Sequence, residues 1–363
     1  MLVGETPRRA YSDHMNHHAV ILALISAALF GISTPAAKGL LGSIHPAMLA
    51  GLLYCGAGIG IAILRRIAGP LTGATSEAPL ASHDMPWLAG AIVAGGIIGP
   101  LLLMVGLQTT AAAAASLLLT LEGVATALLA WFVFQENFDR RIALGMVFLV
   151  AGAAILSWSG APTLNSVIGP AAIAGACLAW GLDNNLTRKV SLADPLQIVE
   201  LKGLVAGPIN IAIGLGAGAE FPAMTPLLIA GFVGFLGFGV SLALFVLALR
   251  HLGTARTGAY FSTAPFLGAI AALLLLREPL TLQLVMAGAL MALGVWLHLT
   301  ETHEHEHEHE PMGHTHAHIH DPHHQHEHGR DDPPGEPHTH RHRHERMRHT
   351  HPHVPDMHHT HRH

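Results

Sequence analysis

The chain has 363 residues, of which 51% are hydrophobic and only 12% are charged, whereas an ordinary soluble domain is about a quarter charged. The charge is also unevenly placed, because residues 300–363 hold 12 of the 24 acidic residues, 6 of the 19 basic residues and 23 of the 30 histidines. This composition excludes an ordinary soluble globular protein. It favours an apolar, membrane-embedded part followed by a histidine-rich tail.

Ten apolar runs follow one another before the tail, and each is long enough for a membrane-spanning helix, which needs about 20 mostly apolar residues. The runs show almost no polar stripe at helical spacing, so they do not resemble the helices of a soluble protein. The first begins near Ala19, with no signal-peptide cleavage pattern before it. The two cysteines lie within apolar runs and form no CxxC metal motif. The predicted spans are residues 18–37, 46–64, 86–107, 111–134, 142–158, 167–184, 196–216, 226–249, 255–276 and 280–299.

The basic residues of the connecting segments indicate the orientation of these spans. If the N-terminus lies in the cytosol, ten basic residues fall on the cytosolic side and only Lys38 and Arg277 fall outside. An even number of spans then returns the histidine-rich tail to the cytosol. We therefore expect an inner-membrane protein with both termini in the cytosol. The ten cytosolic residues are Arg8, Arg9, Arg65, Arg66, Arg140, Arg141, Arg188, Lys189, Arg250 and Arg256.

Two sequence patterns occur once in each half of the chain. Phe30-Gly31, six residues and Lys38 recur as Trp180-Gly181, six residues and Arg188. Likewise, Glu136 precedes Gly152 by sixteen residues, as Glu278 precedes Gly294. Each half contains five predicted helices, so the second half enters the membrane upside down. Inverted repeats are typical of alternating-access transporters, whose substrate site lies near the midplane between the halves.

The end of the second half, Glu278-Pro279-Leu280-Thr281 followed by Gln283, Gly288 and Gly294-Val295, resembles the EamA-type repeat of the drug/metabolite transporter superfamily. The repeated Phe/Trp-Gly signature and Pro265 resemble that family too, and the resemblance covers residues 18–299. It implies ten helices, cytosolic termini and transport, often export, of small metabolites. Residue Gly123, preceded by Glu122, stands where the first half matches Pro265, which is a departure from the family pattern.

Charged residues inside spans cost roughly 2.5–3.5 kcal/mol each on insertion scales, so they are candidates for function. Glu122 lies eleven residues into an apolar helix, and we expect it to couple transport to protons or to bind a substrate cation. The alternative is a structural ion pair with Lys202. Glu200 and Lys202 lie early in the seventh helix, where a role in the pathway and a local structural role both remain open. Being two positions apart, they point to different helix faces.

Three further polar residues could line the transport pathway. Asp183 and Asn184 lie near the end of the sixth helix, where they would form an inner gate or merely a solvated helix end. Lys38 occupies the corresponding place on the outer side, after a helix-loosening proline. It would attract anions at a gate or extend its ammonium group to the membrane surface.

The tail has histidine at many alternate positions and no hydrophobic period, so we expect residues 300–363 to be disordered. Imidazole groups suit Zn, Ni, Co and Cu(II), which predicts binding of a divalent metal, although no cofactor is required. Metal as cargo, a metal buffer, a metal sensor and a pH sensor all remain open. The candidate ligands are His303, His305, His307, His309, His314, His316, His318, His320, His323, His324, His326 and His328.

The sequence therefore predicts an all-α membrane protein of ten transmembrane helices in two inverted five-helix repeats. The expected units are residues 1–17, 18–158, 166–299 and the tail, 300–363. The leading hypothesis is a secondary transporter, in particular an exporter, of a small solute through the lipid bilayer, with a metal-binding cytosolic tail. A Zn, Ni or Co exporter and a membrane-anchored metal store or sensor are the alternatives. Nothing predicts enzymatic chemistry, a nucleic-acid partner or an ATP-binding loop, and a homodimer is left open.

Overall fold

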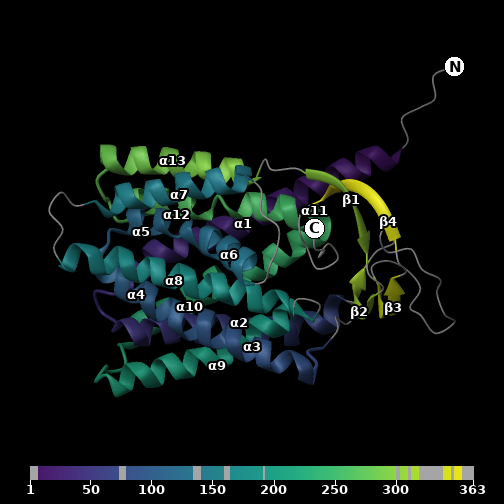
Figure 1. Ribbon diagram of the computed structural model, residues 1–363. Helices are drawn as coiled ribbons and strands as arrows, with labels where there is room; N and C mark the ends of the chain where they lie inside the picture. Colours follow the sequence, from purple (N-terminus) through teal and green to yellow (C-terminus); the bar gives the residue numbers. More distant parts are fainter. Residues whose placement is uncertain are drawn as a thin grey trace.

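The computed structural model describes residues 7–72, 79–133, 140–158, 164–190 and 193–299 of the membrane part, and four short segments of the tail. The helices lie roughly side by side in one bundle (Figure 1). Helix α1 begins at the end of the bundle beyond which the strands of the tail lie (Figure 1). The described ends of the chain are therefore at the same end of the molecule.

The first half comprises helices up to residue 157. Its long helices α1 and α2 each contain a run of apolar residues long enough to cross a bilayer. The next apolar segment is divided into four pieces, and the one after it into two. The bounds are α1 (Pro7–Leu40), α2 (Pro46–Thr72), η1 (Ser82–Asp84), α3 (Met85–Ala91), η2 (Ile92–Ile98), α4 (Gly99–Thr109), α5 (Ala112–Leu118), α6 (Leu121–Phe132) and α7 (Arg140–Ser157).

The second half repeats this order with fewer breaks. Its helices are α8 (Leu164–Arg188), α9 (Pro195–Gly216), α10 (Met224–Gly234), η3 (Phe235–Val240), α11 (Ser241–Phe261), α12 (Ala264–Leu275) and α13 (Leu282–Leu299). The predicted connection at 250–254 is wrong in position, because α11 is helical through Phe261. No proline falls within 250–254 to end the helix there.

Eight helical segments in the described part of the chain are long and apolar enough to cross a membrane. Two shorter apolar helices, Ala264–Leu275 and Leu282–Leu297, follow them. Each of the ten overlaps one of the runs predicted from hydropathy. The structure therefore confirms a multi-pass helical membrane protein.

The two halves pack through corresponding helices. α2 packs along α9, and α7 packs along α13. α1 of the first half lies against α11 and α12, as α8 of the second half lies against α4 and α6. Small residues permit these close crossings: an added Cβ at Gly58 would meet the backbone of Gly203 and Leu204. The core thus lies between the halves.

Two irregular features recur in both halves. π-helical turns occur at η2 and η3, and such turns are frequent at functional sites. The helical segment after each of them is interrupted, between Leu118 and Leu121 in the first half and between Phe261 and Ala264 in the second. These breaks lie in the middle of apolar segments, and a polar side chain stands at each of them, Thr120 in the first half and Thr263 in the second.

Four segments of the tail are strands, where the sequence predicts disorder. β1 (His303–His309) pairs antiparallel with β4 (Met347–His353), and β2 (Met312–His318) pairs antiparallel with β3 (His338–His344). The alternation of histidine with other residues suits the period of two of an extended chain. A ribbon of only two strands is marginally stable in water, so these pairs do not amount to a folded domain.

Candidate functional site

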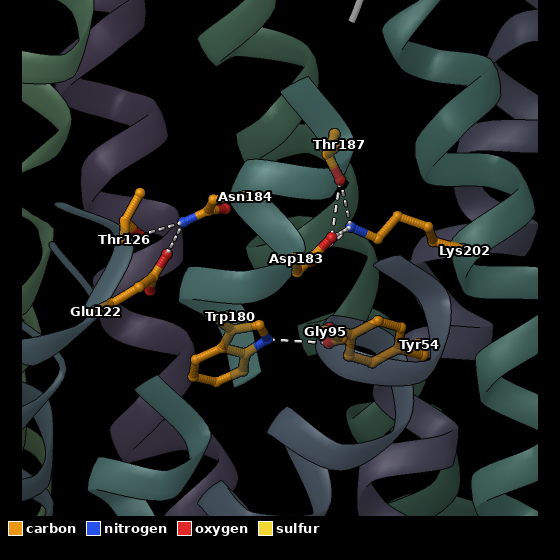
Figure 2. A network of polar contacts seen from close by, with 9 residues as sticks. All are labelled: Tyr54, Gly95, Glu122, Thr126, Trp180, Asp183, Asn184, Thr187 and Lys202. Carbon is orange, nitrogen blue, oxygen red and sulfur yellow. Dashed lines mark hydrogen bonds and ion pairs between the residues drawn. The ribbon is translucent and has the colours of Figure 1, made fainter. Parts of the chain in front are cut away.

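The sixth and seventh predicted spans are joined by a buried ion pair. Lys202 on α9 donates from Nζ to both carboxylate oxygens of Asp183 on α8, at 2.6 and 2.7 Å (Figure 2). Thr187, one turn further along α8, also donates to Asp183 Oδ1 at 2.8 Å. The side chains of Lys202 and Asp183 are only 16% and 9% exposed. Two opposite charges therefore neutralise each other inside the membrane part.

Glu122 lies nearby on α6, beside the break between α5 and α6 (Figure 2). Asn184 Nδ2 donates to Glu122 Oε1 at 2.9 Å and to Thr126 Oγ1 at 3.2 Å. Asn184 is exposed and Glu122 is half-buried, and a Cβ added at Gly123 would meet nothing within 4 Å. The structural ion pair considered for Glu122 and Lys202 is therefore wrong, because the ammonium group bonds to Asp183. Glu122 instead accepts a hydrogen bond from a neutral amide, that of Asn184.

A backbone carbonyl of the π-helical turn η2 completes the site. The Gly95 carbonyl accepts from Tyr54 Oη at 2.6 Å and from Trp180 Nε1 at 2.9 Å. The neighbouring Gly96 carbonyl accepts from Asn210 Nδ2 at 2.9 Å. These donors come from α2, α8 and α9, so three helices hold this turn. Glycine is needed at Gly95 because an added Cβ would collide with the carboxylate of Asp183.

Glu200 belongs to a different cluster, near the start of α9. Arg65, in the C-terminal part of α2, pairs with Glu200 and, at 2.8 Å, with Asp194. Asp194 also caps α9 by accepting from the Leu196 amide at 2.9 Å. Glu200 and Lys202 thus point to different faces of α9, as their spacing predicts.

Lys38 is separated from these groups in the fold. It donates to the carbonyls of Leu107 and Gln108 at the end of α4. Glu278, of the repeated family pattern, accepts from the amides of Ala112 and Ala113 at 2.7 and 2.8 Å. Both signature residues therefore cap the same turn, the one between α4 and α5, and Lys38 has a structural partner there.

We call the set Glu122, Thr126, Asp183, Asn184, Thr187 and Lys202 the central polar network. The sequence analysis selected four of its members from charge and polarity within apolar runs. It missed Tyr54, Trp180 and Asn210, whose hydrogen-bonding groups within apolar spans were the available signal. It also missed Arg65 as the partner of Glu200, because contacts between distant helices are not visible in a single sequence.

The candidate metal ligands divide into two groups. His303, His305, His307 and His309 lie in β1, and His314, His316 and His318 lie in β2. The other five, at positions 320, 323, 324, 326 and 328, lie outside the described residues. Among the described side chains, which do not include those of the tail, no three His, Cys, Asp or Glu residues form a group that could hold a metal ion.

Comparisons with known proteins agree with this architecture. The model of the EamA-like transporter family matches residues 17–158 and again residues 167–300. A protein of Methanothermobacter thermautotrophicus named "uncharacterized transporter" is 30% identical over 296 residues, which cover 76% of this chain and 84% of that protein. A crystal structure at 16% identity covers 77% of this chain and 95% of its own, with a TM-score of 0.57, and shows likeness of fold alone.

Proposed function

Because the chain belongs to the EamA-like transporter family, we propose that it is a secondary transporter that exports a small solute across the inner membrane. We propose further that its ten apolar segments all cross the bilayer, as two inverted repeats of five helices with both termini in the cytosol. The start of α1 and the tail strands lie at the same end of the bundle (Figure 1), as an even number of crossings requires. The excess of basic residues predicted for that side supports it too.

The observation that carries the proposal is the charge balance of the central polar network. Its ionisable residues are Glu122, Asp183 and Lys202, and Lys202 bonds to Asp183. The carboxyl group of Glu122 is left with a neutral hydrogen-bond donor, Asn184. Inside a membrane a carboxylate without a bonded cation is costly. Glu122 is therefore the group that takes up a proton or a positively charged group of the solute.

This role is tested by replacing Glu122 with glutamine, which keeps the shape and removes the charge. Purified protein would be placed in liposomes loaded with a filtered cell extract, and released compounds would be identified by mass spectrometry. Glu220→Gln is the matched control, because Glu220 is exposed and precedes α10. We expect release by the unchanged protein and the control, and loss of that release in Glu122→Gln.

Two outcomes contradict the proposal. Release by Glu122→Gln at the rate of the unchanged protein would remove Glu122 from the mechanism. Failure of the unchanged protein to release any compound above empty liposomes would contradict transport itself. Gel filtration of each variant checks that it is folded.

We also propose that the tail binds a divalent metal for regulation or delivery. The register of the tail strands supports this. In both strand pairs, histidine positions are paired across the two strands, and along each strand these positions recur at every second residue. Imidazole is a preferred ligand of Zn, Ni and Co. The opposed positions are His303 and His353, His305 and His351, His307 and His349, His314 and His342, His316 and His340, and His318 and His338.

Cutting the chain after Thr302 separates the roles of the tail. Cells with the full chain, the truncation and Glu122→Gln would be compared for tolerance and content of Zn, Ni and Co. Regulation predicts that the truncated protein loses metal dependence but still moves its solute. If metal is the cargo, truncation lowers metal export only when metal is scarce. A metal store predicts lower metal capacity with unchanged flux. Equal tolerance and content in all three strains would eliminate the metal exporter.

A further inference from the structure

The two halves correspond residue by residue where the helices are interrupted. α6 and α12 each have 12 residues and begin 143 positions apart, at Leu121 and Ala264. Before each of them a threonine hydroxyl donates to the carbonyl three residues earlier, Thr120 to Leu117 at 2.8 Å and Thr263 to Tyr260 at 2.6 Å. By this correspondence Pro265 is the counterpart of Glu122 itself, and not of Gly123 as the sequence suggested.

The repeated glycines give a second correspondence. An added Cβ at Gly31 would meet Ala264 and Gly268 of α12, and one at Gly181 would meet Ala125 of α6. Since Ala125 and Gly268 are also 143 positions apart, α1 crosses α12 as α8 crosses α6. The helices α2 and α9 both begin at a proline, at Pro46 and Pro195. Every helix of the central polar network therefore has a known counterpart.

The charges of the network break this symmetry. Counted from the repeated glycines, Asp183 and Asn184 correspond to Ser33 and Thr34. Counted from the two prolines, Lys202 corresponds to Leu53, which is 2% exposed and apolar. Glu122 corresponds to a proline. The counterpart positions thus contain no charge, and the Ser33 hydroxyl bonds to a carbonyl of its own helix, that of Phe30.

The ion pair of the network also lies toward one end of the bundle. Contacts of α5 and α6 with α8 advance together along both chains, from Leu118 of α5 with Cys177 to Thr126 of α6 with Asn185, so this segment runs parallel to α8. Asp183 lies near the C-terminal end of α8, and Lys202 lies early in α9. Arg65 and Asp194 join α2 to the start of α9 at the same end.

From these observations we infer that Asp183 and Lys202, with Asn184 and Glu122, form a one-sided lock that holds α8 against α9 and α6. The lock closes the end of the bundle at which α8 terminates. The two open states of an inverted repeat exchange the conformations of its halves, so they would be nearly equal in energy if the halves were identical. The charged contacts of the network have no charged counterpart at the matching positions of the other half, so they shift this equilibrium toward closure of the end at which they lie. Glu122, the carboxyl group without a bonded cation, is the residue through which a bound proton or solute releases the lock.

This inference rests on the proposed transport cycle, but its test does not require the solute. Cys55 and Cys177 would be replaced by alanine, and spin labels attached to cysteines at Ile67 and Phe132. Both positions are exposed and lie near the ends of α2 and α6, at the locked end. Pulsed electron paramagnetic resonance in lipid nanodiscs then measures the separation of the labels.

The double variant Asp183→Asn with Lys202→Gln removes the ion pair without leaving the charge of either partner unpaired. We expect a several-fold larger population at long distance than in the unchanged protein. The charge swap Asp183→Lys with Lys202→Asp should restore the short distance. Thr187→Val, which removes a single hydrogen bond to Asp183, should give a smaller shift and serves if the double variant does not fold.

A short distance in both the neutral double variant and Thr187→Val, equal to that of the unchanged protein, would overturn the lock. An equally large long-distance population in the charge swap and the neutral variant would overturn it too. Release of solute from liposomes, measured in parallel, distinguishes failure of the lock from failure of the proposed function. If the protein releases solute but the label distances are the same with and without the ion pair, it is a transporter without this lock.

Discussion

The crossing of α8 and α6 at Gly181 gives a prediction that can be worked from distances. A Cβ added at Gly181 would lie 2.9 Å from the carbonyl carbon and the Cβ of Ala125 and from the backbone nitrogen of Thr126. Ordinary contact begins near 3.4 Å. Two of the three neighbours are backbone atoms, so the helices must separate for Gly181→Ala. Such overpacking costs about 1–3 kcal/mol.

Gly123→Ala is the matched control on the partner helix. A Cβ there meets nothing within 4 Å, and alanine is favoured over glycine in a helix by about 1 kcal/mol. Both variants gain that preference, so their difference isolates the crossing, and we expect Gly181→Ala to be less stable by about 1–3 kcal/mol. Thermal unfolding in detergent, followed by gel filtration of the remaining folded protein, measures it. Equal midpoints for the two variants would refute the close crossing.

Three other contacts give predictions of the same kind. Trp180→Phe and Tyr54→Phe each remove one donor to the Gly95 carbonyl and should each lower stability by about 1 kcal/mol, with the double variant less stable than either single variant. Unchanged stability in all three variants would contradict the role of these two donors in holding the π-helical turn η2. Ser26→Ala removes the hydrogen bond from the Ser26 hydroxyl to the Ser241 carbonyl and keeps the bond from the Ser241 hydroxyl to the Ser26 carbonyl; it should destabilise the packing of α1 on α11 by about 1 kcal/mol, measured by the same thermal assay against Ser43→Ala. A double-mutant cycle of Arg65→Gln and Glu200→Gln should give a coupling of about 0.5–3 kcal/mol, and strict additivity would show that the pair contributes nothing.

The sequence predicts the apolar segments well, because a span is a property of local composition and each run stands out against its flanks. The position of a break within a run is a different matter. Pro265 signals the interruption before α12, but nothing comparable marks the one between Leu118 and Leu121. Both π-turns were missed too, since a glycine-rich run such as 94–96 is equally compatible with a regular helix in a membrane.

Charged candidates within spans were also predictable, because polar residues are rare there. Their partners were not. Lys202 bonds to Asp183 rather than to Glu122, and this choice depends on the rotation of α8, α9 and α6 about their axes. The repeated signatures were recognised as a family pattern, but their physical roles came from the fold. Gly31 and Gly181 allow helices to cross, whereas Lys38 and Glu278 cap the turn before α5.

The inverted arrangement of the two halves underlies both the proposed site and the proposed lock, and a topology measurement tests it directly. Reporters that are active only in the cytosol, or only outside it, would be fused after His363 and inserted between the halves, before α8 begins at Leu164. Five spans in each half predict that the reporter after His363 is cytosolic and that the reporter in the connection is external. Both reporters on the same side of the membrane would contradict the inverted repeat.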